Sequence, residues 1–139
     1  MRSIAFPRFR NAEGFLVPVE FSVLPFEPKR LFYIKNVPYG AVRGNHAHKE
    51  GHQIIISVVG EFLLQAEQYS NCGSPEYYET LLNASDERIQ NAFYAPPKTW
   101  LVLSAFSEGS VCLVLSSHTY DPEDYINERS EFKRLCHSV

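Results

Sequence analysis

Residues 44–53 read GNHAHKEGHQ and hold three of the five histidines in the chain. If residues 44–48 are extended, side chains alternate between the two faces of the strand, so His46 and His48 share one face and Ala47 takes the other. The two imidazoles then project side by side into the same space. His52 alternates away from Gln53, and we expect it on the outer face of its strand.

The spacing around the two histidines is also informative. Gly40 lies six residues before His46, Gln53 lies five residues after His48, and Gly60 follows seven residues later at a hairpin. This spacing resembles the first sequence motif of the cupin superfamily, in which a glutamate stands at the position of Gln53. The resemblance implies a small β-barrel or jelly roll with its site in the barrel mouth.

The rest of the chain supports an all-β fold. Short apolar and β-branched runs recur between proline and glycine turns, and no helical period stands out before residue 121. The expected strands are residues 15–23, 30–37, 44–48, 53–59, 61–68, 77–82, 91–95, 99–105 and 111–118. Residues 121–136 open with DPED and favour a short helical segment, since proline and acids are common at helix starts. We expect a single cupin domain, residues 1–139.

Composition excludes several classes of function. The 13 Lys and Arg against 16 Asp and Glu give a net charge of −3, which does not supply the basic surface of a nucleic-acid-binding protein. The sequence contains no apolar run near the roughly 20 residues of a membrane span, and charged residues interrupt residues 1–10 where a signal peptide would be apolar. The three cysteines form no CxxC pair, which favours reduced thiols. These features predict a cytoplasmic protein without nucleic-acid or membrane partners.

A catalytic metal is not expected. In metal-binding cupins, the motif glutamate and a further histidine complete the metal shell, but here Gln53 replaces the glutamate and residues 95–103 contain no histidine. A neutral amide is a poor ligand for a divalent ion, and two histidines leave the shell short. We therefore expect acid and base roles for the histidines and no cofactor.

Four segments give a closer resemblance that covers most of the chain. They are KRLFYI (29–34), VRGNHAHK (42–49), GSVCLVLSSH (109–118) and YDPEDYI (120–126). Together they resemble the sugar nucleotide 3,4-ketoisomerases, a family of small cupins. The resemblance implies isomerisation of a dTDP-linked 4-keto-6-deoxyglucose to its 3-keto isomer, without a metal or cofactor, in the biosynthesis of deoxyamino sugars such as those of lipopolysaccharide O-antigens, S-layers and antibiotics.

This reaction moves a proton from C3 to C4 through an enediolate. Imidazole suits such a step because its ordinary pKa of about 6.5 makes both protonation states accessible near neutrality. By resemblance, His48 is the expected base at C3 and His46 its partner at C4 or at the oxygen. Tyr33 is the candidate for relaying a proton or binding the oxyanion.

Four further residues are expected to bind the substrate. The paired donors of Arg43 suit a phosphate or sugar, and Gln53 occupies the cupin glutamate position. Trp100 could stack on thymine or sugar, and Asn45 lies inside the histidine motif. Residues 120–125 are expected to be structural, closing the barrel or a dimer.

The sequence leaves two alternative functions open and also favours one mode of assembly. The alternatives are a sugar-nucleotide 3,5-epimerase, whose usual separated Asp and Tyr partners are not evident, and a non-catalytic sugar-binding or regulatory cupin. The resembling ketoisomerases form homodimers that exchange amino-terminal strands, which would cover exposed edges. We therefore expect a twofold dimer whose interface includes part of residues 1–26.

Overall fold

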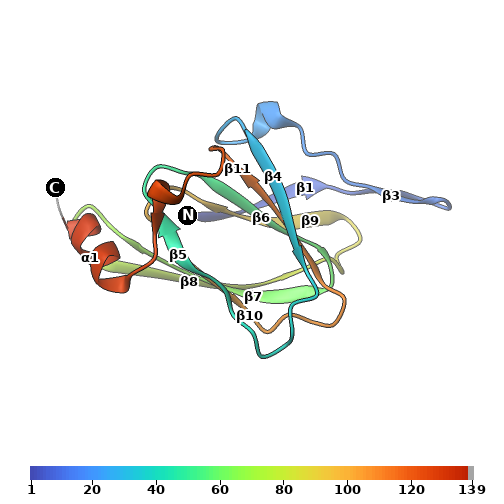
Figure 1. Ribbon diagram of the computed structural model, residues 1–139. Helices are drawn as coiled ribbons and strands as arrows, with labels where there is room; N and C mark the ends of the chain where they lie inside the picture. The colour runs from blue at the N-terminus through green and yellow to red at the C-terminus, as the bar shows by residue number, and fades with distance from the viewer. Residues whose placement is uncertain (138–139) are drawn as a thin grey trace.

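The computed structural model describes residues 1–137 as two five-stranded antiparallel sheets packed face to face (Figure 1). The first sheet has the order β1 (Arg2–Pro7), β9 (Ile89–Ala95), β6 (Gln53–Val59), β11 (Val111–Ser116) and β4 (Arg30–Lys35). The second has the order β12 (Tyr125–Ile126), β5 (Arg43–His48), β10 (Trp100–Ser104), β7 (Glu61–Tyr69) and β8 (Pro75–Asn83). This arrangement is the expected all-β cupin sandwich.

Three short helical segments and one hairpin complete the chain. The helical segments are η1 (Phe21–Val23), η2 (Pro122–Asp124) and α1 (Arg129–His137). The hairpin joins β2 (Phe9–Asn11) to β3 (Gly14–Leu16) and projects from one end of the molecule, while α1 lies at the other end (Figure 1). The expected helical segment at residues 121–136 is thus confirmed as η2 and α1, with β12 between them.

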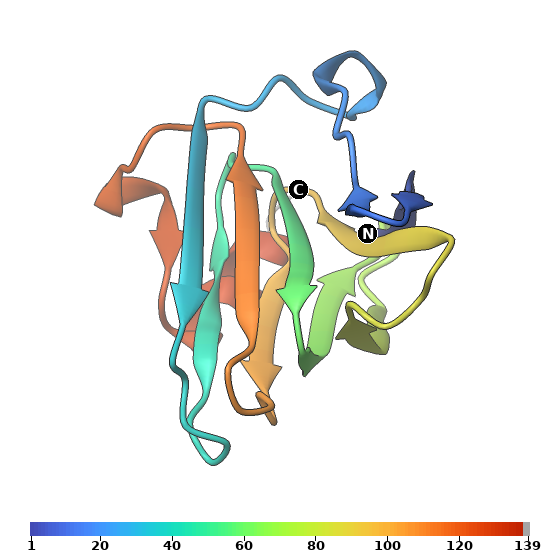
Figure 2. The same cartoon turned by 90° about the vertical axis from the view of Figure 1, so that its right-hand side faces the viewer.

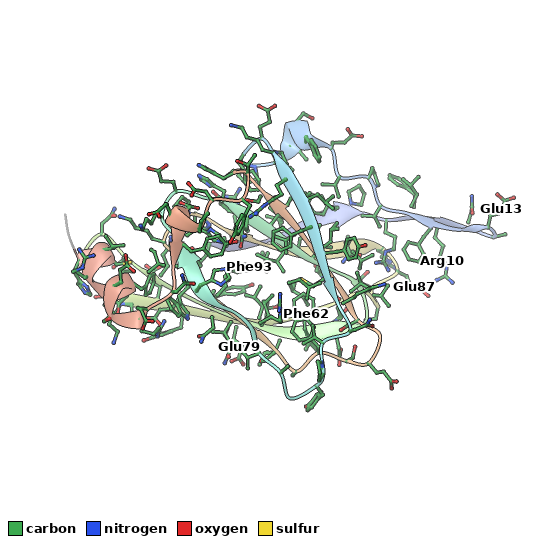
Figure 3. The ribbon with its side chains drawn as sticks, in the orientation of Figure 1. Arg10, Glu13, Phe62, Glu79, Glu87 and Phe93 are labelled. Carbon is green, nitrogen blue, oxygen red and sulfur yellow. The ribbon has the colours of Figure 1, made fainter. Side chains whose placement is uncertain are left out.

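The core lies between the inner faces of the two sheets. Phe62 of β7 and Phe93 of β9 are fully buried there, facing the interior from opposite sheets (Figure 3). On the outer face of the first sheet, Ile54 and Ile56 belong to a second apolar cluster, against which Leu24 packs. Because both of its faces are covered, the first five residues of β6 are all buried, and this explains the apolar run of three isoleucines at 54–56.

Eight of the nine expected strands are present as β4 to β11. The prediction of one strand over residues 15–23 is wrong, since β3 ends at Leu16 and residues 21–23 form η1. Gly14 has φ +128°, a backbone conformation that L side chains rarely adopt, and it allows the chain to turn back on β2. Pro18 then follows without an N–H for further pairing. Strands β1, β2 and β12 were not foreseen.

Two features of the fold position the site. Strand β4 is an edge strand of the first sheet, while β5 belongs to the second, and Figure 2 shows both strands on the same side of the molecule. Side chains of both strands line one pocket. The C-terminal segment pairs β12 with β5 and lays α1 on the outer face of the second sheet, over Trp100 and Ala47. Within residues 1–137, no helix has the length and apolar character to span a membrane.

Candidate functional site

A pocket of about 240 Å³ opens between the two sheets. It draws its walls from strands of both sheets, and its polar side chains are those of His46, Gln53, Arg43 and Tyr125. The complete lining is Phe32, Ile34, Arg43, Gly44, His46, Gln53, Ile55, Leu101, Leu103, Val114 and Tyr125. A few polar groups in a largely apolar wall are typical of a small-ligand site.

His46 presents one free ring nitrogen. Its Nδ1 lies 2.9 Å from the carbonyl oxygen of Gly44, and because a carbonyl only accepts, Nδ1 carries the hydrogen and Nε2 keeps its lone pair. Gly44 has φ +74°, and a Cβ there would lie 2.9 Å from the carbonyl oxygen of Leu101, so this turn of the strand needs glycine. Burial lowers the pKa of His46, the Gly44 carbonyl opposes this shift, and Arg43 adds to it. The imidazole is therefore a neutral base near pH 7.

His48 lies behind His46, with ring centroids 5.2 Å apart, and does not line the pocket. Its side chain is 8% exposed, and its Nδ1 lies 3.1 Å from Oδ2 of Asp124. Burial is the main cause that lowers its pKa to about 4, the neighbouring His46 adds to the shift, and Asp124 opposes it. Its Nε2 is buried and has no hydrogen-bond partner among the described residues.

Tyr125 is a site residue that the sequence analysis missed. Its ring centroid lies 4.9 Å from that of His46 and 4.5 Å from that of His48, and it lines the pocket. Residues 120–125 were expected to be structural, and Tyr125 of this segment both pairs with β5 and lines the pocket. The YDPEDYI segment was the available signal, but the sequence does not show that β12 pairs with β5 and sets Tyr125 opposite His48.

Gln53 and Arg43 lie where the sequence predicted a site. Gln53 begins β6, is buried and lines the pocket. Arg43 begins β5, is exposed, and also borders an adjoining outer pocket of about 520 Å³ that Lys35 helps to line. His52 points away from Gln53 as expected, where its Nδ1 lies 2.7 Å from the hydroxyl of Tyr94.

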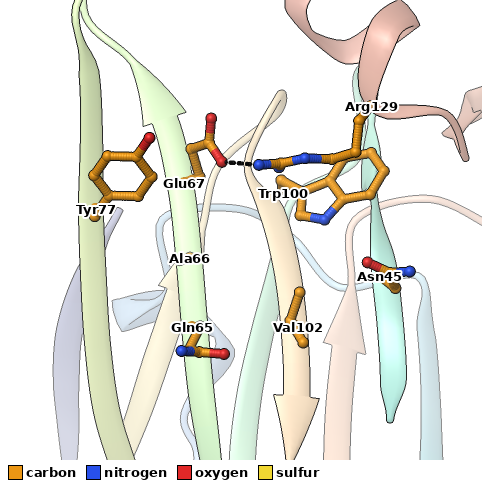
Figure 4. Close-up of a pocket in the computed structure, with 8 residues that line it drawn as sticks. All are labelled: Asn45, Gln65, Ala66, Glu67, Tyr77, Trp100, Val102 and Arg129. Carbon is orange, nitrogen blue, oxygen red and sulfur yellow. Dashed lines mark hydrogen bonds and ion pairs between the residues drawn. The ribbon is translucent and has the colours of Figure 1, made fainter.

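Three predicted residues lie outside the histidine pocket. Tyr33 is 62% exposed on the outer face of β4, because Phe32 and Ile34 on either side take the inward positions. Asn45 and Trp100 line a separate pocket of about 360 Å³ on the outer face of the second sheet (Figure 4). These three residues lie outside the histidine pocket because neighbours in a strand point to opposite faces. Tyr33 lines the adjoining outer pocket together with Lys35 and Arg43, and the roles expected of the three residues stay predictions.

The second pocket is closed at one side by an ion pair between a half-exposed arginine and a buried carboxylate. Arg129 of α1 donates to the carboxylate of Glu67 on β7 and lies over the ring of Trp100, as Figure 4 shows. Trp100 is 3% exposed, so its ring is already covered. Within residues 1–137, no group of three or more His, Cys, Asp and Glu side chains is arranged to hold a metal ion.

Comparison with known proteins gives the family. A family model described as "FdtA: WxcM-like, C-terminal" matches residues 1–137. The chain belongs to this FdtA/WxcM-like family. A curated relative, the TDP-4-oxo-6-deoxy-alpha-D-glucose-3,4-oxoisomerase of Aneurinibacillus thermoaerophilus, is 30% identical over 137 residues, which cover 98% of this chain and 92% of the relative.

Solved structures of FdtA/WxcM-like relatives share the whole architecture. QdtA, a sugar 3,4-ketoisomerase from Thermoanaerobacterium thermosaccharolyticum crystallised with TDP, has a TM-score of 0.83 at 31% identity, covering 97% of this chain and 93% of QdtA. A mutant of QdtA crystallised with TDP-4-keto-6-deoxyglucose has a TM-score of 0.83 at 30% identity, covering 97% and 92%. The resemblance read from the four sequence segments is thus confirmed.

Proposed function

We propose that this FdtA/WxcM-like protein is a TDP-sugar 3,4-ketoisomerase that converts a TDP-linked 4-keto-6-deoxyglucose to its 3-keto isomer. The observation that carries the proposal is the free Nε2 of neutral His46 in the pocket between the sheets. The relatives support it, since the curated relative and QdtA are both named as 3,4-isomerases of such sugars. They favour this function over the epimerase alternative.

We assign the base at C3 to His46 and not, as the sequence suggested, to His48, because only His46 lines the pocket. Its Nε2 takes the proton from C3, and the electron pair forms the C3–C4 double bond while the C4 carbonyl oxygen becomes an oxyanion. The hydroxyl proton then passes from O3 to O4. Return of a proton to C4 places the carbonyl at C3, so the isomerisation consumes no other reactant.

We assign the hydroxyl transfer to Tyr125, which takes the role first expected of Tyr33. Its phenol lines the same pocket and its ring lies against both imidazoles. A phenol both donates and accepts, so it can exchange the hydroxyl proton between two neighbouring oxygens. Gln53, with two donors and an acceptor in the same wall, is assigned to bind the sugar hydroxyls.

The size of the pocket supports a divided substrate site. Its volume of about 240 Å³ lies below the roughly 300–1,000 Å³ of pockets that enclose a drug-sized ligand. We propose that the sugar ring enters it and that the nucleotide stays outside. Arg43 borders both this pocket and the larger outer one, where Lys35 adds a second cation, so the diphosphate is assigned to this boundary.

Incubation with TDP-4-keto-6-deoxyglucose in deuterated water tests the function. A 3,4-ketoisomerase gives a product whose carbonyl stands at C3, with deuterium at C4 to the extent that the base exchanges its proton. A 3,5-epimerase keeps the carbonyl at C4 and labels C3 and C5, and a binding protein leaves the sugar unchanged. Nuclear magnetic resonance of the sugar carbons separates the three, and either of the last two outcomes rejects the proposal.

We propose that turnover requires neither a metal nor a cofactor. The support is the neutral amide of Gln53 in the pocket wall, where metal-binding cupins have a carboxylate. Dialysis against a chelator should leave the rate within twofold. Loss of activity that a stoichiometric divalent metal restores would contradict this.

We extend the proposal to the oligomeric state and the cellular location of the protein. We propose a homodimer in which the β2–β3 hairpin contacts the partner, supported by the exposed apolar side chains of Phe9, Phe15 and Leu16 on that hairpin. We also propose a cytoplasmic location, supported by three cysteines that are free in the structure. Cell fractionation tests the location, and a periplasmic or membrane fraction would contradict it.

A further inference from the structure

The carboxylate of Asp124 joins three separate groups of the chain. It ends η2, and its side chain is 10% exposed. Its Oδ1 accepts from the backbone N–H of Glu50 at 2.8 Å, and its Oδ2 accepts from that of Gly51 at 3.2 Å and from Nδ1 of His48 at 3.1 Å. Both oxygens are therefore satisfied without water, as a buried carboxylate requires.

The chain is shaped around this carboxylate. The backbone carbonyl of Asp124 accepts from the N–H of Lys49 at 2.8 Å, so the turn after β5 is held by both the main chain and the side chain of one residue. A Cβ on Gly51 would lie 2.7 Å from Oδ2 of Asp124. The absence of a side chain at residue 51 thus makes room for the carboxylate beside His48.

The contact fixes the chemical form of His48. An ionised carboxylate only accepts hydrogen bonds, so Nδ1 of His48 carries the hydrogen and Nε2 holds a lone pair. That Nε2 is buried without a partner, which is unusual for a polar atom and calls for a functional reason. In the other tautomer, the Nδ1 lone pair would face the carboxylate and repel it.

We propose that Asp124 is a positioning residue of the isomerase, which acts through His48 by holding its ring in the Nδ1–H tautomer and so leaving Nε2 as an acceptor beside His46 and Tyr125. The effect on catalysis rests on the proposed function, but the hold on the tautomer does not. The orientation of the ring is transmitted directly, since the three rings of His46, His48 and Tyr125 pack against one another.

Asp124→Asn removes the carboxylate that accepts from Nδ1 of His48, with little change in side-chain volume. An amide offers one oxygen and two N–H donors, so it cannot accept from His48, Gly51 and Glu50 at both ends. If its nitrogen takes the Oδ2 position, it donates to Nδ1 and reverses the tautomer of His48. Gly51→Ala is a second variant that keeps the charge and displaces the carboxylate by contact.

Asp121→Asn is the matched control. Asp121 is the N-cap of η2, and its side chain accepts from the N–H of Glu123 at 3.0 Å, whereas the carboxylate that contacts His48 is that of Asp124. Asparagine caps a helix about as well as aspartate. This variant should retain wild-type kinetics and the wild-type tautomer.

The tautomer is read in the folded protein without substrate, by ¹⁵N resonances of labelled histidine, with His48→Gln to assign the signals. Wild-type His48 should show the Nδ1–H form, and Asp124→Asn should lose it while the signals of His52 and His118 stay in place. The kcat of Asp124→Asn should fall about 10- to 100-fold, the loss seen when the partner that orients a metal-bound imidazole is removed. Its KM should stay within about threefold, and Gly51→Ala should shift kcat in the same direction.

The pH profile gives a further readout that a purely structural role would not move. The groups that act on His48 are His46, Asp124 and Arg30, and only Asp124 carries negative charge. Because Asp124→Asn removes this negative charge, the acidic limb of the kcat–pH profile should move to lower pH. An unchanged His48 tautomer in Asp124→Asn, or a kcat within twofold of wild type, would overturn the proposal. If wild-type protein does not isomerise the sugar but the tautomer changes as expected, the proposed function fails and the hold of Asp124 on His48 stands.

Discussion

His46 and His48 stand two residues apart on one face of β5, yet their surroundings give them different chemistry. The first is tied to a backbone carbonyl and borders the pocket, and the second is tied to a carboxylate and is buried. Both therefore keep the hydrogen on Nδ1 and the lone pair on Nε2. Only the environment of each ring separates the histidine that lines the pocket from the histidine that lies behind it.

His46→Asn should remove isomerisation while leaving TDP binding within about threefold. A general base typically contributes 10²–10⁴-fold, and a group that acts only in the transition state affects turnover more than ground-state affinity. The rate is measured with TDP-4-keto-6-deoxyglucose and the affinity by calorimetry with TDP. Wild-type turnover in this variant would show that His46 is not the base.

The unfolding free energy should fall as the pH falls from 6.5 towards 4. The folded pKa of His48 is lowered to about 4, below the ordinary value of about 6.5, so between these values the unfolded chain binds a proton that the folded chain does not. Near pH 4 the unfolding free energy should be lower by about 1–3 kcal/mol, since each unit of pKa shift corresponds to about 1.4 kcal/mol. Above pH 6.5 we expect no such decrease. Burial lowers the pKa of His46 and His52 as well, so both add to the same trend.

Urea unfolding at several pH values between 7 and 4.5 measures this effect. His48→Gln should flatten the dependence, because glutamine does not titrate. A wild-type unfolding free energy that is independent of pH over this range would contradict the prediction.

At the scale of elements, the sequence predicts that successive side chains of a strand alternate between its two faces, but it does not predict which face points inward. The sequence placed His46 and His48 on one face, and Gln53 near His46, because strand period and motif spacing are local properties. In β4, however, Phe32 and Tyr33 are adjacent aromatic residues, and the period alone does not say which faces inward. The structure turns Phe32 into the pocket. Tyr125 required knowledge of a pairing with a strand almost 80 residues earlier, which no local pattern contains.

The placement of α1 should depend on the ion pair between Arg129 and Glu67. Arg129→Met keeps packing over Trp100 but leaves the buried Glu67 carboxylate without its cation. Leaving a buried polar group without its partner costs about 1–3 kcal/mol, which urea unfolding should detect. The control is Glu79→Gln, at an exposed carboxylate on β8 that accepts from Gln65, where a change within about 0.5 kcal/mol is expected. Equal effects of the two variants would contradict the role of the pair.

At the scale of the whole molecule, the β2–β3 hairpin stands out because every residue of its two strands is exposed. It projects from the sandwich (Figure 1), and its tie to the body includes an exposed ion pair between Arg10 and Glu87 (Figure 3). Surface ion pairs contribute little stability. An extended, apolar and exposed arm of this kind is suited to contact a second copy of the chain.

Replacement of Phe15 and Leu16 together by serine should therefore convert a dimer to a monomer. Sedimentation velocity at micromolar concentration measures the change. Tyr77→Ser is the control, because Tyr77 is exposed like Phe15 and Leu16 but lies on β8 of the second sheet, outside the hairpin. A wild-type protein that sediments as a monomer would contradict the proposed assembly.

The late position of Asp124 and Tyr125 in the chain has a consequence for synthesis. Every strand except β12 precedes them, so translation completes the segments of both sheets before the ribosome adds the two residues that hold and flank the histidines. The nascent chain therefore carries His46 before it carries Asp124, which contacts His48, and Tyr125, which completes the wall of the pocket. The arrangement of the three rings would then form only when β12 docks on β5.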